Sequence, residues 1–181
     1  MNNDTTTLTD TLQWFAIRTR QAFKAEAELA ARCSEVYFPK ESVKGSDGRT
    51  RVRAIIPRVL FIRTTEEHAL AMEREGREKP GPGVPPFWIY RNPGSLLVQQ
   101  VPERTMELLR LLTAPDPTRC TIYGKEDFRT GNRVRVTGGP FRGYEGHVQR
   151  VKKNKHVVVR IEGICTVLLP FIHPDLLEVM N

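Results

Sequence analysis

The chain has 181 residues, which is enough for one medium-sized domain or two small ones. Its 28 lysines and arginines outnumber its 21 aspartates and glutamates, and the net charge of +7 favours a polyanionic partner, although an ordinary basic bias has the same signature. The three cysteines lie far apart without a CxxC pair or a His/Cys cluster, which argues against a zinc site or a disulfide framework and fits a reducing cytosol.

Residues 1–11 predict a disordered tail, since they are polar and lack both the basic and the apolar region of a signal peptide. No apolar run approaches the length needed to span a bilayer, so we expect a cytoplasmic protein with no membrane partner. Residues 12–18 then predict a short buried strand. Residues 21–33 predict a helix with apolar and small side chains on one face.

A hairpin is predicted next. Residues 36–43 have the character of a strand, residues 45–48 (GSDG) supply turn chemistry, and residues 50–56 return as a second strand. Arginine occupies alternate positions on this return, which makes one face of the ribbon strongly basic. These arginines are Arg49, Arg51 and Arg53.

Residues 59–63 (VLFIR) predict a core strand, because they form a short apolar run. A helix follows, capped by Thr64 or by Thr65; Glu67, three residues after Thr64, would complete a capping box. We expect this helix to end near Gly76.

A loop, two strands and a third helix complete the first half. Residues 80–86 (PGPGVPP) predict a loop, residues 87–90 and 96–101 short strands, and Pro102 the first turn of a helix. The order of elements predicts an α+β domain over residues 12–112, with helices packed on a mainly antiparallel sheet.

The remainder predicts a linker and a second domain. Residues 113–127 are polar, contain proline and show no period, so we interpret them as an interdomain linker. Residues 128–181 predict a small all-β domain. Strands at residues 156–161, 164–169 and 176–179, together with the hairpin before them, are expected to close a five-stranded, SH3-like barrel.

The hairpin within residues 131–151 carries the most specific pattern of the chain. Valines alternate with arginines along its first strand, and glycines and a proline then break the strand into a tight turn. The pattern closely resembles a KOW motif, the basic hairpin of small barrels that handle RNA or ribosomal and transcription partners. The matching residues are Gly131, Val134, Val136, Gly139, Pro140, Phe141 and Gly146.

The two halves together resemble the NusG family of transcription elongation factors. The first half contributes Trp14-Phe15, Phe23, residues 56–62 and Pro82-Gly83-Val84 before Phe87. The resemblance implies an amino-terminal NusG (NGN) domain that docks on RNA polymerase, a linker and a carboxy-terminal KOW domain. Residues 98–106 look most like the specialised paralogues, among which the UpxY-type antiterminators of capsular polysaccharide operons are the most similar.

In this family the first domain binds the clamp helices of RNA polymerase through an apolar depression on its sheet. A small apolar patch left exposed suits a partner helix pair; the alternative is that the same side chains fill the core. The family usually has a tyrosine where Val59 stands and a glycine or asparagine where Arg58 stands, and Arg58 would add a charge pair. The docking residues implied by the resemblance are Ile56, Val59, Phe61, Phe87 and Trp88.

The resemblance also implies contact with the displaced non-template strand, with upstream DNA or with leader RNA. Such contacts need cations for phosphates and guanidinium groups for base edges. A solvated basic face is the alternative, above all for the hairpin. The candidate residues are Arg18, Arg20, Lys24, Arg49, Arg51 and Arg53.

The carboxy-terminal domain differs from the general factor at its partner surface. The general factor places an aromatic residue before a glycine and an arginine after it to engage ribosomal protein S10 or Rho. Around Gly163 these places hold Glu162 and Ile164. Since a carboxylate does not replace a buried aromatic anchor, we expect weak or absent Rho binding, and binding to ribosomal protein S10 stays open.

Enzymatic chemistry has no support in the sequence. The histidines have no nucleophile or metal spacing, and Gly138-Gly139-Pro140 lacks the Gly-Lys-Ser/Thr of a phosphate-binding loop. We therefore expect no catalytic residue, cofactor or metal. The predicted function is a transcription elongation regulator that binds RNA polymerase and suppresses pausing and termination, as an operon-specific antiterminator. The alternative is a KOW-containing RNA- or ribosome-binding protein.

Overall fold

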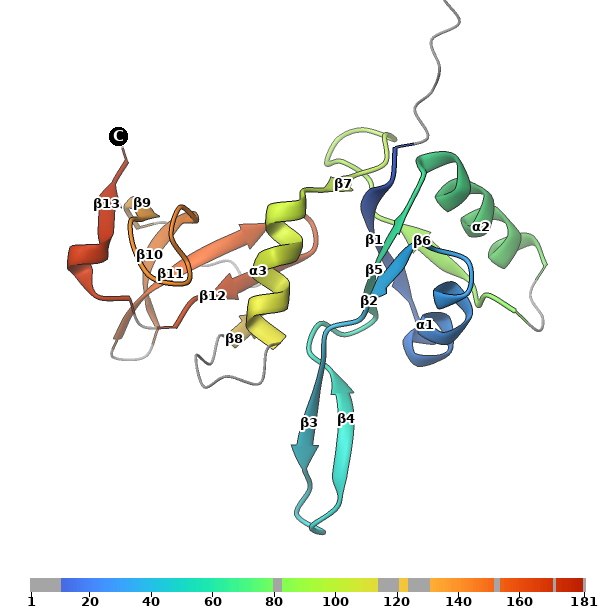
Figure 1. Ribbon diagram of the computed structural model, residues 1–181, viewed down its shortest axis with the longest axis horizontal. Coiled ribbons are helices and arrows are strands. Elements are labelled where there is room, and N and C mark those ends of the chain that lie inside the picture. Colours follow the sequence, from blue (N-terminus) through green and yellow to red (C-terminus); the bar gives the residue numbers. More distant parts are fainter. Residues whose placement is uncertain are drawn as a thin grey trace, which may run out of the picture. The chain divides into compact units, whose positions relative to one another are not determined.

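The structure is a computed structural model, shown in Figure 1. It describes residues 11–79, 83–113, 121–123, 131–151, 154–170 and 172–180. Within these ranges the chain is a mixed α/β protein with antiparallel sheets and three α-helices. Contacts divide it into two compact units: the first comprises Met1–Phe38 and Arg58–Pro102, the second Pro39–Pro57 and Glu103–Asn181. In the described part of the chain, no helix is long and apolar enough to cross a membrane.

The first unit is built on a sheet with β1 at its centre. β1 (Gln13–Thr19) pairs antiparallel with β5 (Val59–Thr64) on one side and with β6 (Phe87–Ile89) on the other. β2 (Glu35–Tyr37) pairs with β5, and β7 (Gln100–Val101) pairs with β1. The strand order β2-β5-β1-β6 confirms the predicted antiparallel sheet.

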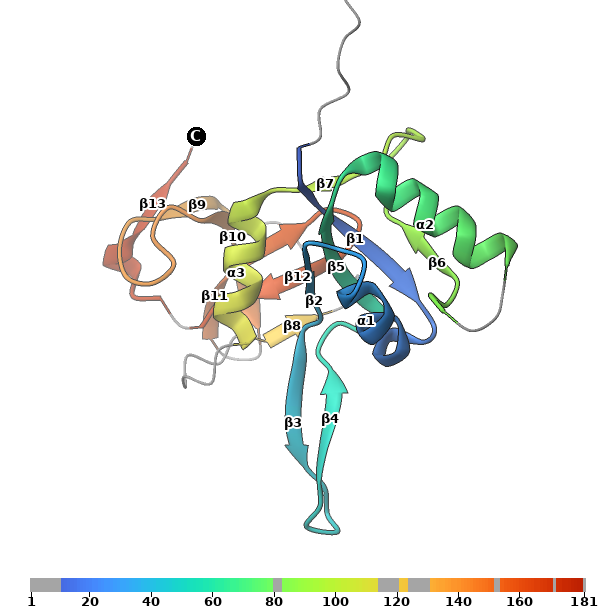
Figure 2. The same ribbon diagram turned by 45° about the vertical axis from the view of Figure 1, so that its right-hand side comes forward.

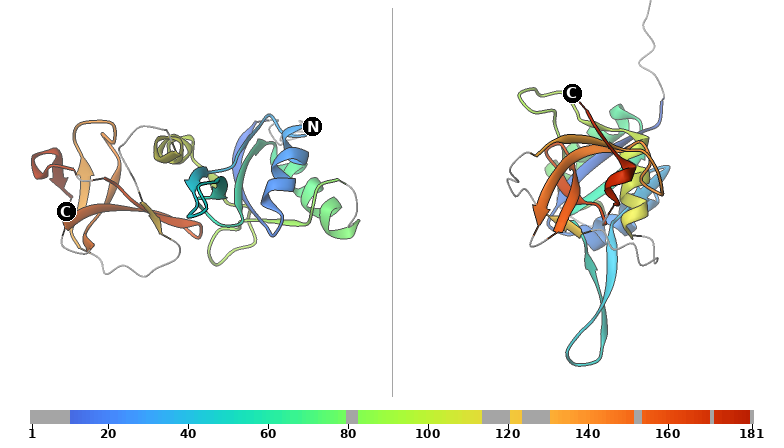
Figure 3. Two further views of the ribbon diagram at one scale, coloured as in Figure 1. Left: turned by 90° about the horizontal axis from the view of Figure 1, so that it is seen from below. Right: turned by 90° about the vertical axis from the view of Figure 1, so that its left-hand side faces the viewer.

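Two helices cover one face of this sheet, as Figures 2 and 3 show. α1 (Ala22–Ala30) connects β1 to β2, and α2 (Glu66–Glu78) connects β5 to β6. Thr65 precedes α2, and its Oγ1 accepts the backbone N–H of His68 at 3.2 Å. The cap is therefore Thr65, and the helix continues to Glu78, past its predicted end.

The core of the first unit follows the apolar run of β1. Four consecutive residues from Trp14 to Ile17 are buried, so both faces of this central strand are covered. The predicted strand at residues 96–101 is shorter, because Leu96 and Leu97 lie in a loop with 92% and 70% exposure. Apolar composition alone made that segment resemble a strand.

The predicted hairpin forms a sheet of its own within the second unit. β3 (Lys40–Lys44) pairs antiparallel with β4 (Thr50–Ala54), with Lys44 opposite Thr50. Figure 1 shows the two strands as a long separate ribbon. The break at Phe38-Pro39 separates β3 from β2, where the sequence predicted one continuous strand.

The second unit also contains α3 (Glu103–Thr113) and a six-stranded antiparallel sheet at the KOW region. α3 buries Met106, Leu108 and Leu109, in agreement with the predicted helix. The sheet order is β13-β9-β10-β11-β12-β8. Its strands are β8 (Thr121–Tyr123), β9 (Arg133–Val136), β10 (Glu145–Val151), β11 (Asn154–Ile161), β12 (Cys165–Leu168) and β13 (Leu177–Val179), the last preceded by a short 3-10 turn (Pro174–Leu176).

This sheet has one more strand than predicted. β8 lies inside the segment interpreted as a linker, where Thr121, Ile122 and Tyr123 are residues that favour strands, and it pairs with β12. The other residues of that segment after Thr113 lie outside the described ones. The described pairings form a path that ends at β13 and β8, so the predicted barrel closure stays a prediction.

Candidate nucleic-acid interface

Strand register brings three arginines and a tryptophan together in the first unit. On β1, Arg18 lies opposite Val59 of β5 and Trp88 of β6, and Arg58 immediately precedes Val59. These side chains surround a hollow of about 300 Å³, which we name the arginine–tryptophan hollow. Its lining residues are Arg18, Thr19, Arg20, Arg58 and Trp88.

Buried Thr19 holds the backbone around this hollow. Its hydroxyl donates to the carbonyl of Pro86 at 2.9 Å, and its backbone N–H donates to the carbonyl of Arg58 at 2.9 Å. Among the described residues, Arg58 is the one non-glycine residue with a positive φ, 66°. L-residues adopt the left-handed conformation at a cost, and the hydrogen bond from the Thr19 N–H to the Arg58 carbonyl helps to hold it.

The charge of the hollow is not compensated. Within the described residues, none of Arg18, Arg20 and Arg58 forms an ion pair. Trp88 is 48% exposed and offers its ring at the edge of this cluster. Guanidinium groups beside an accessible aromatic ring are the combination that binds phosphates and stacks bases of a single strand. Lys24 is exposed on α1 and does not line the hollow.

The arginines of the β3–β4 hairpin have a different environment. Arg51 pairs with Asp47 at 2.8 Å, and Arg53 pairs with Glu41 at 2.6 Å, both on the surface of the hairpin itself. Arg49 is exposed. The predicted basic face is present, but neighbouring carboxylates reduce its attraction for a polyanion.

Most of the residues predicted to dock on RNA polymerase are core residues here. Ile56, Val59, Phe61 and Phe87 are between 0% and 4% exposed. Trp88, the fifth of the set, is accessible to a partner. The burial agrees with the alternative that these side chains fill the core, and their role in polymerase docking stays a prediction.

The KOW hairpin depends on glycine at a close approach between strands. A side chain at Gly146 of β10 would collide with the carbonyl of Val158 and come within 2.9 Å of Val157 Cγ1. At the turn, Gly139 has a φ of 73° and Gly143 donates its N–H to the carbonyl of Val136 at 2.6 Å. The glycines of the KOW pattern are therefore needed because the backbone leaves no room for a side chain at Gly146 and adopts a positive φ at Gly139.

Around this turn the side chains alternate as predicted. Val134 and Val136 are buried on β9, while Arg133 and Arg135 are exposed. Of the other motif residues, Phe141 is buried, and Gly131 and Pro140 are exposed. Packing of the apolar members holds the hairpin on its sheet.

One carboxylate neutralises much of the charge on β9. Glu145 on β10 accepts hydrogen bonds from Arg135 and from Arg133, each at 2.8 Å. The hydrogen bond from Arg135 is the main cause that holds the pKa of Glu145 below its ordinary value. These two arginines are therefore engaged within the sheet.

The two residues predicted to form an altered partner surface lie at the turn between β11 and β12. Gly163 has a φ of 71°, Glu162 beside it is exposed and Ile164 is buried. Ile164 thus packs inward, and the turn presents the carboxylate of Glu162. The predictions about binding to Rho and to ribosomal protein S10 stay predictions.

The described cysteines are poor nucleophiles. Burial raises the pKa of the Cys33 thiol to about 11 and that of Cys165 to about 12, so both stay protonated at neutral pH. Among the residues that the structure describes, no group of three or more His, Cys, Asp or Glu side chains is arranged to hold a metal ion.

The sequence did not identify every residue of interest. It assigned Arg58 to a polymerase contact, and the fold places Arg58 beside Arg18 and Arg20. Arg104 and Tyr144 were missed, because nothing in their separate segments indicates that they meet.

Comparison with known proteins supports the KOW assignment. The family model described as "KOW motif" matches residues 130–162, which is 33 of the 181 residues (130 to 162 inclusive). The match confirms the KOW pattern predicted from the glycine-marked hairpin. It is consistent with the NusG family and equally with other KOW proteins. No curated protein matches the chain.

Proposed function

We propose that the protein is a transcription elongation regulator of the NusG type, which binds RNA polymerase and suppresses pausing and termination as an operon-specific antiterminator. One observation carries the proposal: a KOW motif at residues 130–162 stands in the same chain as a hollow of three arginines, beside an exposed tryptophan, that form no ion pair with any residue the structure describes. The resemblance of residues 12–112 to an NGN domain, and to the UpxY-type factors, is part of the proposal.

The hollow is the proposed contact with nucleic acid at the polymerase. Arg18, Arg20 and Arg58 would neutralise phosphates of the displaced non-template strand, and their lack of ion pairs among the described residues leaves the guanidinium groups available. Binding of this strand upstream would oppose its reannealing and so reduce pausing. The protein changes the state of the polymerase and makes or breaks no covalent bond.

Docking on the clamp helices is proposed to use Trp88 as the accessible residue. The buried residues Ile56, Val59, Phe61 and Phe87 would shape the surface from beneath. A single exposed aromatic anchor in a supported surface is sufficient to dominate an interface. In the second unit, Glu162 and Ile164 support weak or absent Rho binding, while ribosomal protein S10 is retained as a possible partner.

In vitro transcription tests this function. The template carries the leader of the chain's own operon, and RNA polymerase from the same organism is used with and without the full chain. We expect a lower pause lifetime and less termination with the protein. The Arg18→Glu/Arg20→Glu variant is expected to lose this effect, and Trp88→Ala is expected to weaken co-purification of polymerase.

The matched control is Arg51→Glu/Arg53→Glu, which changes the charge by the same amount on the hairpin, where both arginines already have carboxylate partners. Unchanged elongation with wild-type protein, together with co-purification of ribosomal RNA or a ribosomal subunit, would reject the proposal. That result would favour the KOW-containing RNA- or ribosome-binding protein.

A further inference from the structure

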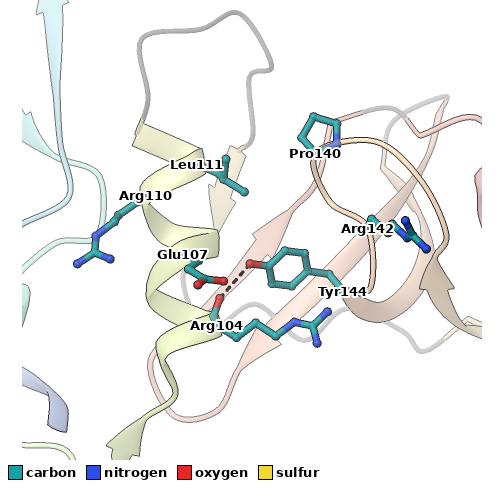
Figure 4. A pocket seen from close by; sticks show the side chains of 7 residues that line it. All are labelled: Arg104, Glu107, Arg110, Leu111, Pro140, Arg142 and Tyr144. Carbon is teal, nitrogen blue, oxygen red and sulfur yellow. Dashed lines mark hydrogen bonds between the residues drawn. The ribbon is translucent and has the colours of Figure 1, made fainter.

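A second hollow lies within the second unit, between α3 and the turn that connects β9 to β10. It has a volume of about 700 Å³, within the range of protein cavities that accept a small ligand or a short chain segment. Figure 4 shows its lining side chains. They are Arg104, Glu107, Arg110 and Leu111 from α3, and Pro140, Arg142 and Tyr144 from the turn.

Two contacts hold the walls of this hollow together. The Tyr144 hydroxyl donates to the backbone carbonyl of Arg104 at 3.0 Å, and the Arg104 guanidinium carbon lies 4.8 Å from the centre of the Tyr144 ring. Gly143 provides the space, because a side chain there would come within 2.6 Å of Arg104 Nη2. The cation–π contact and the hydrogen bond therefore orient Arg104 across the ring.

The lining is basic and only partly compensated. The charged residues of the lining are three arginines and one carboxylate, Glu107. Arg110 pairs with Glu103 at 3.4 Å. Arg104 and Arg142, in contrast, have no ion pair within the described residues. Two cations are thus available at this hollow.

We propose that this hollow binds the phosphodiester backbone of a single-stranded nucleic acid. The guanidinium groups do not converge on one point: Arg104 lies against the Tyr144 ring, Arg142 stands on the turn, and Arg110, already paired with Glu103, points away from the turn (Figure 4). Such a distribution fits successive phosphates along a chain better than one phosphate ion.

The same geometry predicts contact with phosphates and little base reading. Arg104 already covers a face of the Tyr144 ring, so a base would have to displace the guanidinium to stack there. The site should therefore show weak sequence preference and a strong dependence on salt. An acidic peptide has carboxylates in place of phosphates and is the competing occupant that the experiment distinguishes.

Binding is measured by fluorescence anisotropy with the full chain carrying Arg18→Glu/Arg20→Glu, so that the arginine–tryptophan hollow does not contribute, and with a labelled oligouridylate and a labelled oligothymidylate. Arg142→Glu is expected to weaken the affinity for the strand on the order of tenfold, because it removes a cation and adds repulsion. Arg142→Ala should make the slope of log K against log salt shallower by about 0.7, the value for one lost phosphate contact of a single strand. Comparison of the two oligonucleotides tells whether RNA or DNA is preferred.

Glu107→Gln is expected to increase the affinity for the oligonucleotides, a result that a folding defect cannot mimic. Removal of the single carboxylate of the hollow should tighten binding of either oligonucleotide. The matched control is Arg160→Glu, an equal charge change at an exposed residue of β11 outside the lining. It should leave most of the affinity intact.

Equal losses for Arg142→Glu and Arg160→Glu, or no gain for Glu107→Gln, would overturn the proposal. It would also be overturned if oligoglutamate displaced the oligonucleotides at equal charge concentration. The test is independent of the proposed function, since it uses no polymerase. If the affinity depends on Arg142 but the protein has no effect on elongation, the proposed regulator is rejected and this site is retained. If the protein affects elongation but the affinity does not depend on Arg142, this site alone is rejected.

Discussion

The carboxylate of Glu73 on α2 accepts a hydrogen bond from the Arg91 guanidinium at 2.8 Å. Its other oxygen accepts the backbone N–H of Ile89 at 2.8 Å, and Arg91 donates in turn to the carbonyl of Ile89 at 2.7 Å. Glu73 is 6% exposed, so this is a nearly buried ion pair. It connects α2 to β6, the strand that carries Trp88 at the arginine–tryptophan hollow.

Replacement of Glu73 by alanine should destabilise the first unit by about 3 kcal/mol, because it leaves a partly buried guanidinium and the Ile89 N–H without their acceptor. Both tryptophans, Trp14 and Trp88, belong to this unit, so their fluorescence in a urea titration reports its unfolding. Glu73→Gln retains one acceptor oxygen and should therefore lower the free energy of unfolding by less. The exposed pair of Arg32 and Glu75 is the control, and an equal loss for Glu75→Ala would contradict the importance of burial.

A difference between two pairs of arginines is the next prediction. Arg18 and Arg20 have no ion pair among the described residues, whereas Arg51 and Arg53 each have a carboxylate partner. Alanine at Arg18 and Arg20 should therefore weaken binding of single-stranded DNA on the order of tenfold and make its salt dependence shallower. Alanine at Arg51 and Arg53 should change the affinity much less. Anisotropy at several salt concentrations measures both, and the reverse order of effects would place the DNA contact on the hairpin.

The sequence predicted those features that depend on local pattern. Alternation identified β9, with Val134 and Val136 buried between exposed arginines. Glycine and proline identified the KOW turn, because Gly139 and Gly146 satisfy backbone requirements that few other residues meet. Strands formed by short apolar runs, such as β1 and β5, were also predicted from the sequence.

The features that could not be predicted from the sequence depend on pairing between distant segments. Arg58 joins Arg18 only through the register of β5 on β1. Tyr144 reaches Arg104 across 40 residues of sequence. Leu96 and Leu97 show the opposite error, since apolar residues in a loop imitate a strand.

The Glu145 cluster should lose part of its stabilising effect in acid. Hydrogen bonds from Arg135 and then Arg133 keep the pKa of Glu145 below its ordinary value, so the folded state prefers the ionised carboxylate. The stabilisation is complete above the pKa that Glu145 has in the unfolded chain, which is about 4.3 for an unperturbed glutamate. It is lost as the pH falls through the lower pKa of the folded state. NMR titration of the Glu145 side chain should show the low pKa. Arg135→Gln should raise it, and Arg160→Gln, on another strand, should leave it unchanged.

The close approach at Gly146 gives a final prediction for the KOW sheet. Alanine there would force β10 away from the Val158 carbonyl and from Val157 on β11, which should cost about 2 kcal/mol or more. Gly48 is the control: its φ of 77° disfavours alanine, but no atom lies within 4 Å of the added carbon, so about 1 kcal/mol is expected. Hydrogen exchange of the β10 and β11 amides measures the loss. Because both tryptophans belong to the first unit, Gly146→Ala should leave the urea transition of tryptophan fluorescence in place. A shift of that transition equal to the loss of amide protection would mean that the two units unfold together.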